Sequence, residues 1–285
     1  MSAPQFDLPT SLEEAARLLA EDPEAKCLAG GATLVALMNA GLVEPTALVS
    51  LRKVEGLAGI TRAGDGSVRI GAMTRHRVTA GSVELKAGQT VVKQAASVIA
   101  NPPVRNMGTM GGSIAFADPG ADYPPALVAA GAEIELASVN GSRRVKAGDF
   151  FTDWYQTALA PGELVAAIHL PAGHPGSIGY YDKLARVEGD YATASVAVVL
   201  TMAGRNCAGI AVAVGACGPK PVRLAEAERK LVGGTLDDAA LAAAGALLAE
   251  AADPVDDVRA SADYRRLVIP RLVRRAVRSA MAQVR

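Results

Sequence analysis

The most informative part of this 285-residue sequence is Asn106-Met107-Gly108-Thr109-Met110-Gly111-Gly112-Ser113-Ile114-Ala115, a glycine-rich segment that is soon followed by Asp118 and Asp122. An earlier glycine pair lies in Leu28-Ala29-Gly30-Gly31-Ala32-Thr33-Leu34. A single Gly-Gly pair is an ordinary turn signal. Two pairs, each followed closely by a small hydroxyl residue, favour a site for a phosphorylated ligand, because amides and hydroxyls bind phosphate oxygen and glycine lets the backbone approach it.

The familiar phosphate-binding motifs are absent from the sequence. It contains neither the G-x-G-x-x-G of a Rossmann domain nor the G-x-x-x-x-G-K-[ST] of a P-loop. Both of those folds are therefore disfavoured. The two glycine-rich segments, which we expect to be loops, predict another kind of dinucleotide site, with FAD as the expected cofactor.

The overall composition indicates a local site rather than a charged binding surface. Lys plus Arg and Asp plus Glu number 29 each, so no net charge favours nucleic acid or an anionic membrane as a partner. No run approaches the roughly 20 apolar residues that span a bilayer. The three dispersed cysteines, Cys27, Cys207 and Cys217, are expected to be buried thiols rather than metal ligands. We expect a cytoplasmic, soluble protein.

Sequence periodicity predicts a first domain of mixed helices and strands. Ser11 and Glu14 form a capping box, which predicts a helix that begins at residue 12. The turn at residues 64–66 predicts a hairpin. Other helices are expected at residues 34–38, 91–100 and 123–130, and strands at residues 25–29, 47–51, 67–70, 132–137, 143–145 and 163–170. Residues 104–125 show the least regular pattern of this half.

A second domain is expected after the stretch from Pro171 to Gly176, which interrupts all periodicity. We therefore predict domains at residues 1–174 and 175–285. Strands are expected at residues 179–183, 194–202 and 210–214, followed by helices at residues 222–232, 236–251 and 261–285, the last interrupted or kinked at Pro270. Strands followed by helices indicate an α+β fold. Six arginines on the last helix favour a solvated basic face, with a subunit-docking surface as the alternative.

The two glycine-pair segments, together with Ala117-Asp118-Pro119-Gly120-Ala121-Asp122, resemble the two FAD signatures of the medium subunit of molybdenum hydroxylases. This family includes subunits or parts of carbon monoxide dehydrogenase, nicotine dehydrogenase and xanthine dehydrogenase. Residues 181–192 resemble the start of the family's second domain, and residues 262–266 resemble its C-terminal helix. The resemblance covers essentially the whole chain. It implies a PCMH-type FAD-binding domain followed by a small domain of an antiparallel sheet and three helices.

The resemblance also implies which residues hold the cofactor. Two segments would enclose the pyrophosphate and the adjoining ribityl chain: Leu28, Ala29, Gly30, Gly31, Ala32, Thr33 and Leu34 in the first, and Thr109, Met110, Gly111, Gly112 and Ser113 in the second. Asp122 would accept hydrogen bonds from cofactor hydroxyls, and Val165 would offer its main chain to the adenine side. Lys183 would face the flavin or its chain, Tyr191 would lie beside the isoalloxazine, and Ile99 would line the site. Many family members carry Asn at the position of Ser113, so the contact made there would come from a hydroxyl instead.

The function that the resemblance implies is electron transfer within a larger oxidoreductase. The chain would take electrons from a small [2Fe–2S] subunit and pass them to an external acceptor, while a large molybdopterin subunit hydroxylates the substrate. The expected assembly is a dimer of heterotrimers, a heterohexamer. We predict no catalytic acid–base residue and no metal site, since the histidines His76, His169 and His174 are dispersed. The alternatives are a self-contained PCMH-type flavin oxidoreductase and a non-catalytic nucleotide-binding module.

Overall fold

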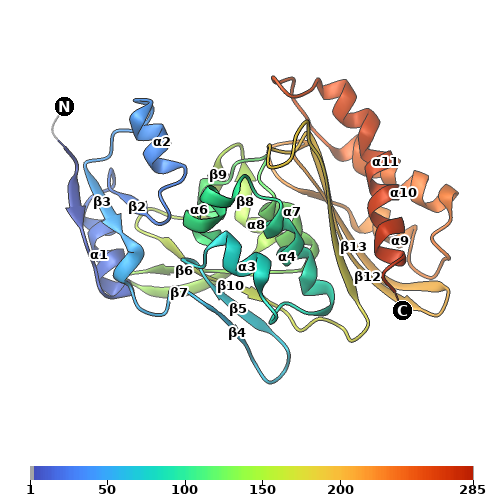
Figure 1. Cartoon of the computed structure of the whole chain (residues 1–285), viewed down its shortest axis with the longest axis horizontal. Helices are drawn as coiled ribbons and strands as arrows, with labels where there is room; N and C mark the ends of the chain where they lie inside the picture. The colour runs from blue at the N-terminus through green and yellow to red at the C-terminus, as the bar shows by residue number, and fades with distance from the viewer. Residues whose placement is uncertain (1–2, 285) are drawn as a thin grey trace.

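The computed structural model of the chain describes residues 3–284. Three parts follow one another along the longest axis of the molecule (Figure 1): a small N-terminal unit, a central sheet with helices, and a second sheet backed by the C-terminal helices. Within the described range, no helix is long and apolar enough to cross a membrane. The predicted α+β class is confirmed, because the helices and the mostly antiparallel sheets occupy separate layers.

The N-terminal unit is a parallel three-stranded sheet with the order β1-β3-β2. The capping box predicted at Ser11 is confirmed in part: the Ser11 hydroxyl accepts a hydrogen bond from the Glu14 amide, while the Glu14 carboxylate accepts one from the amide of Thr10. The predicted strands and helices of this unit are also confirmed. Its elements are β1 (Gln5–Asp7), α1 (Leu12–Glu21), β2 (Lys26–Leu28), α2 (Leu34–Asn39), β3 (Ala47–Ser50) and the 3-10 helix η1 (Leu51–Lys53).

The central sheet has five antiparallel strands in the order β4-β5-β10-β6-β7. The predicted turn at residues 64–66 joins β4 to β5, and the last strand predicted for the first domain, β10, lies in the middle of the sheet between β5 and β6. A β-bulge interrupts the pairing of β10 with β6 between Val165 and Ala167. The strands are β4 (Ile60–Arg62), β5 (Val68–Gly71), β6 (Glu133–Ser138), β7 (Gly141–Lys146) and β10 (Leu164–Leu170).

The stretch from residue 104 to residue 125, whose pattern was the least regular of this half, contains the start of α7, which was predicted, and two short helices that were not. The prediction missed these two because glycine and proline are poor helix formers, and here they occupy first turns and caps. Asn101 caps α5 and Thr109 caps α6, in each case by accepting the amide three residues on. The elements between β5 and β10, β6 and β7 apart, are α3 (His76–Gly81), η2 (Ala87–Gln89), α4 (Thr90–Ser97), α5 (Pro102–Met107), α6 (Met110–Phe116), α7 (Tyr123–Ala129), α8 (Ala147–Phe150), β8 (Phe151–Asp153) and β9 (Gln156–Thr157).

The C-terminal part is an antiparallel sheet, β11-β12-β13-β14, covered on one side by three helices (Figure 1). The three predicted strands are confirmed. The helix expected from Val222 is wrong at its start, because Val222 and Arg223 pair with β13 and the helix begins three residues after Val222. Pro270 lies within a continuous helix rather than interrupting it. The elements are β11 (Ile178–Leu184), β12 (Ala194–Ala203), β13 (Asn206–Gly215), β14 (Val222–Arg223), α9 (Ala225–Arg229), α10 (Asp238–Ala251) and α11 (Ala262–Met281).

The two main sheets share one core across α4 and α7. Ile134 of the central sheet, Leu127 of α7 and Ala197 of β12 all belong to this core. The neighbouring β12 residues Val196 and Val198 face the other way, into the core formed with the three C-terminal helices. Because β12 is buried on both faces, its sequence is a continuous apolar run rather than an alternating one. The second sheet is therefore fixed against the helices that border the candidate site.

Truncation of Leu127 tests this shared core. Leu127 is fully buried, so Leu127→Ala should lower the free energy of unfolding by about 2–5 kcal/mol through lost burial and a residual cavity. Leu42→Ala is the matched control, because Leu42 is 72% exposed and its loss should change stability by less than about 0.5 kcal/mol. Denaturant unfolding followed by circular dichroism measures both. Equal stability of the two variants would contradict the shared core.

Candidate cofactor-binding site

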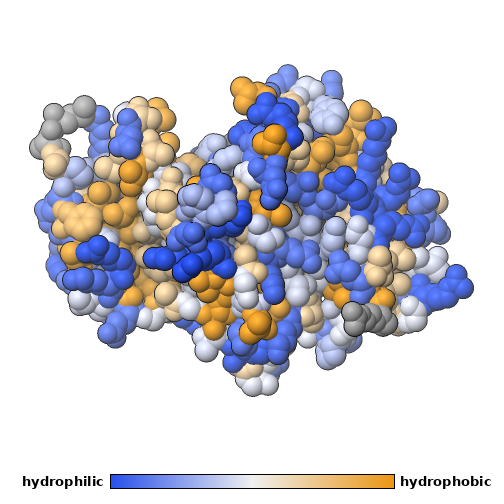
Figure 2. All heavy atoms as spheres, viewed as in Figure 1, coloured by the Kyte–Doolittle hydropathy of each residue, from blue (hydrophilic) through white to orange (hydrophobic). Residues whose placement is uncertain are grey.

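A cavity of about 780 Å³ lies between the N-terminal unit and the helices α5 and α6. Figure 2 shows the surface notched on this side, between the lobe that carries α2 and the rest of the molecule. Its volume falls within the range of roughly 300–1,000 Å³ usual for ligand sites. Fourteen of the seventeen predicted cofactor residues line it: Ala29, Gly30, Gly31, Ala32, Thr33, Leu34, Ile99, Thr109, Gly111, Gly112, Ser113, Asp122, Val165 and Tyr191.

The other three predicted residues do not line this cavity. Met110 is fully buried in the core shared by the two sheets. Leu28 ends β2 and is half-buried. Lys183 donates hydrogen bonds to the carbonyl oxygen of Val98 and to the carboxylate of Asp122. Their predicted contacts with the cofactor therefore remain predictions, and any such contact of Lys183 would be shared with Asp122.

The first glycine segment presents free backbone donors. Among the described residues, none of the amides from Gly30 to Thr33 donates a hydrogen bond within the protein. Gly31 has a φ of +75°, a conformation that favours glycine and that turns the chain between β2 and α2. The segment is half-buried and lines the cavity. Four adjacent free amides form a site suited to an anion such as a pyrophosphate.

The second glycine segment is the first turn of α6 rather than a loop, and its amides from Met110 to Ser113 are already satisfied. Met110 donates to the carbonyl oxygen of Thr74, Gly111 to that of Ala72, and Gly112 to the hydroxyl oxygen of Thr109. This corrects our expectation of two loops that bind in the same way. What the first turn of α6 offers the cavity is the Ser113 side chain and the exposed backbone surface of Gly112.

Two of the four glycines are required by packing within the protein. A Cβ on Gly30 would overlap the carbonyl oxygen of Met107, and a Cβ on Gly111 would lie 2.5 Å from the Cβ of Ala72. The two segments therefore touch through their backbones. Gly112 differs, since its Cβ would meet side chains rather than backbone: the Thr109 hydroxyl at 3.0 Å and the Cβ of Ala29 at 3.5 Å.

Asp122 joins the first part of the chain to the second. Its carboxylate accepts a hydrogen bond from the Tyr181 hydroxyl (2.7 Å) and forms an ion pair with the Lys183 ammonium (3.1 Å). All three side chains are buried or nearly so. Burial raises the pKa of Asp122, and the charge of Lys183 and the Tyr181 hydrogen bond oppose that rise. A carboxylate has room for further donors, so the predicted contact with a cofactor hydroxyl stays open.

Other residues that line the cavity were not predicted from the sequence. His76 is buried, and desolvation lowers its pKa to about 4, with the nearby Arg105 acting in the same direction. It is therefore a neutral ring that contacts the Tyr123 hydroxyl. Lys26 supplies a cation, and Phe116 an aromatic ring, to the same cavity. Only the helical register of α6 could have indicated Phe116, and nothing in the local sequence marks Lys26 or His76.

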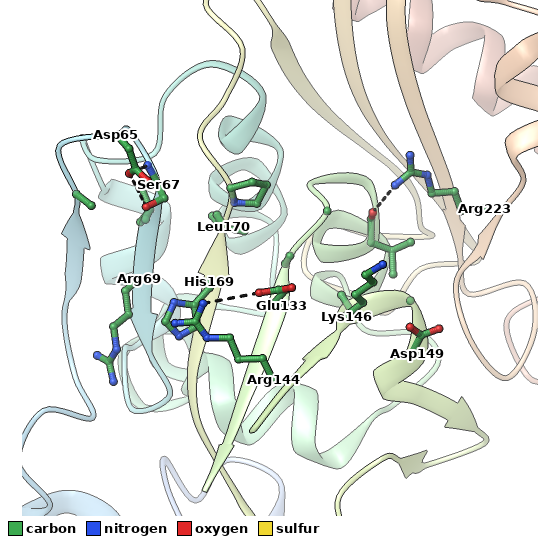
Figure 3. Close-up of a pocket in the computed structure, with 18 of the residues that line it drawn as sticks. Asp65, Ser67, Arg69, Glu133, Arg144, Lys146, Asp149, His169, Leu170 and Arg223 are labelled. Carbon is green, nitrogen blue, oxygen red and sulfur yellow. Dashed lines mark hydrogen bonds and ion pairs between the residues drawn. The ribbon is translucent and has the colours of Figure 1, made fainter. Parts of the chain in front are cut away.

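A second cavity, of about 1,100 Å³, lies on the solvent-facing side of the central sheet. Figure 3 shows its charged side chains, among them the ion pair of Arg144 with Glu133. Other lining residues also have partners. His169 contacts Glu135 at 2.5 Å, and Arg223 binds Glu228 and the carbonyl oxygen of Val128. None of the predicted cofactor residues lines this cavity. The first cavity is therefore the candidate site.

Comparison with known proteins gives two family matches that together span the chain. Residues 4–173 match the FAD binding domain in molybdopterin dehydrogenase, and residues 179–280 match the CO dehydrogenase flavoprotein C-terminal domain. The chain belongs to the FAD-binding medium subunits of the molybdenum hydroxylases. This medium subunit is thus a component of an oxidoreductase complex, as the sequence predicted.

Individual relatives agree over their full length. The carbon monoxide dehydrogenase medium chain of Afipia carboxidovorans is 40% identical, with 98% of this chain and 97% of the relative covered. The nicotine 6-hydroxylase medium subunit of Paenarthrobacter nicotinovorans is 34% identical, with 99% of each covered. The structure of carbon monoxide dehydrogenase from Hydrogenophaga pseudoflava superposes with a TM-score of 0.96 at 35% identity, covering 100% of this chain and 99% of that one. The predicted PCMH-type domain followed by a sheet-and-helix domain is confirmed at the level of the fold.

The lining of the medium subunit's cavity is compatible with FAD. Free amides at one wall suit a pyrophosphate, and the hydroxyls of Thr33 and Ser113 suit its oxygens or the ribityl chain. Apolar side chains such as Ile99, Leu34 and Phe116 provide contact surface for rings. Burial raises the pKa of the Cys27 thiol to about 12, so this cavity residue is not a nucleophile.

Replacement of Gly112 tests the wall formed by α6. In Gly112→Leu the new side chain would start 3.0 Å from the Thr109 hydroxyl and extend toward the cavity, while leucine favours the helix. We expect FAD binding at least about tenfold weaker with the fold retained. Gly64→Leu is the control, because Gly64 faces open space in the β4–β5 turn. Bound flavin and thermal unfolding are measured. Normal FAD content in Gly112→Leu would contradict the prediction that Gly112 lies against the bound cofactor.

Removal of Lys183 tests the ion pair with Asp122. In Lys183→Met the folded-state pKa of Asp122 rises further above its unfolded value, so the folded protein gains stability relative to wild type as the pH falls. We expect a loss of about 3–5 kcal/mol near neutral pH and a smaller loss near about pH 5. Denaturant unfolding at both pH values measures it. The double variant Asp122→Asn/Lys183→Met should recover most of the loss, whereas a loss that is the same at both pH values would rule out this coupling.

Proposed function

We propose that this medium subunit binds FAD in the 780 Å³ cavity and transfers electrons from a [2Fe–2S] subunit to an external acceptor. The observation that carries the proposal is the row of free amides from Gly30 to Thr33, facing α6 in a chain whose family model is an FAD-binding domain. FAD supplies the redox chemistry when it is bound. The protein residues bind and orient it, and no acid–base group of this chain is assigned a catalytic step.

Residues from two walls of the cavity, the first glycine segment and α6, would bind the cofactor. The amides of the first segment would hold the pyrophosphate, and Ser113 would donate a hydroxyl to it or to the ribityl chain. Asp122 would orient cofactor hydroxyls from the position fixed by Tyr181 and Lys183. The bulge beside Val165 breaks the regular pairing of β10 at the cavity, which favours a main-chain contact there.

In the proposed assembly, partner subunits supply the iron–sulfur clusters and the molybdopterin. A small [2Fe–2S] subunit and a large molybdopterin subunit would form a heterotrimer with it, and two heterotrimers would form the complex. The domain division at residues 174 and 175 lies in the connection between β10 and β11, which contains no helix or strand. All three cysteines are free, which favours the cytoplasm as the compartment.

Purification of the chain together with its partner subunits tests the function. We expect about one FAD per chain and a flavin absorption spectrum that is bleached when the [2Fe–2S] subunit is reduced. The same chain purified alone should retain flavin but should not oxidise substrate. A chain that is colourless both alone and in its complex would contradict the FAD proposal, and substrate turnover by the isolated chain would favour the self-contained oxidoreductase.

A further inference from the structure

Arg259 lies in the connection between α10 and α11, outside the cavity, yet it contacts a residue that lines it. Its guanidinium carbon is 5.1 Å from the centre of the Tyr191 ring, a cation–π distance. Tyr191 lines the cavity and is 43% exposed, whereas Arg259 is not among the lining residues. Of the residues that line the cavity, Arg259 contacts the Tyr191 ring and forms a long ion pair with Asp190.

The ion pairs that Arg259 forms with neighbouring carboxylates are long. The nearest atoms of Asp257 and Asp190 lie at 3.6 Å and 3.9 Å, beyond hydrogen-bond distance. The Nε atom of Arg259 is buried and, among the described atoms, has no hydrogen-bond partner. The Tyr191 ring is thus a further contact of this guanidinium, at an ordinary cation–π distance.

The loop that carries Arg259 is held in place without the Arg259 side chain. The carboxylate of Asp257 accepts hydrogen bonds from the amides of Arg259 and Ala260 and from the guanidinium of Arg265. Arg265 is itself buried and donates to the carbonyl oxygen of Ala216 at the end of β13. A change at the Arg259 side chain should therefore leave the loop folded.

The Tyr191 side chain also lies beside Asp118 and Gly120. Its amide binds the Asp190 carboxylate, and the backbone of Gly120 approaches the edge of the ring. Burial and the nearby Asp118 raise the pKa of Tyr191 to about 12, so the ring stays a neutral phenol. Because Tyr191 is 43% exposed, the Arg259 guanidinium adds a contact that favours one orientation of the ring.

We propose that Arg259 is a positioning residue that holds the Tyr191 ring at the mouth of the FAD cavity through a cation–π contact. The inference rests on the proposed function, since it assigns the ring a place against bound FAD. It makes the connection between α10 and α11 part of the site, although no residue of that connection lines the cavity. The mouth is then built from both parts of the chain.

Replacement of Arg259 in the full chain, purified with its partner subunits, tests the proposal. Arg259→Gln removes the charge and should weaken FAD binding by about 2–5-fold, the change expected for an exposed cation–π contact. It should also alter the visible circular dichroism of the flavin. Arg259→Lys keeps a cation for the ring and should restore both properties. Arg278→Gln is the matched control, because Arg278 pairs with Asp238 away from the cavity.

A double-mutant cycle with Tyr191→Leu shows whether Arg259 acts through the ring. The effect of Arg259→Gln on FAD affinity should disappear in the Tyr191→Leu background. An effect of equal size in both backgrounds, or an Arg259→Gln variant with the affinity and flavin spectrum of wild type, would overturn the proposal while leaving FAD binding intact. Wild-type protein without flavin would instead overturn the proposed function itself. Thermal unfolding of every variant excludes a loss of fold as the cause.

Discussion

The close approach of two backbone segments, at Gly30 and Met107, is the constraint on which the candidate site depends. Any side chain at residue 30 would overlap the carbonyl oxygen of Met107. Because the segments touch there, the cavity has one wall of free amides and another formed by the first turn of α6. Glycine in this site thus serves protein packing first, and only Gly31 and Gly112 are left to shape the surface offered to a ligand.

A second constraint fixes the other border of the cavity. The buried ion pair between Asp122 and Lys183 crosses from the first part of the chain to the second, and Tyr181 adds a hydrogen bond to the same carboxylate. A buried charge without its partner is strongly unfavourable, so this pair ties the position of β11 to the start of α7. The loop after β11 then brings Tyr191 to the cavity. A site made mainly by the first 174 residues is in this way completed by the second sheet.

The lining of the cavity indicates what this chain contributes to the complex. The chain provides a shaped, partly apolar cavity with a row of free amides at one wall. His76 is neutral and the Cys27 thiol is kept protonated by burial. We propose that such a site binds and orients a redox cofactor, which supplies the chemistry. This proposal agrees with the family of the chain, whose members are subunits of larger oxidoreductases.

The sequence by itself determined the fold class, most helices and strands, and the two segments that border the cavity. These features depend on local signals such as the Ser11 cap, the apolar runs of β10 and β12, and the glycine pairs. Only the tertiary structure showed that Gly111 and Gly112 begin a helix, that Met110 is buried in the core, and that Lys183 binds Asp122. Those outcomes depend on contacts between residues distant in the chain, as does the placing of Arg259 over Tyr191. Local periodicity carries no information about such contacts, because they are fixed only when the sheets and helices pack together.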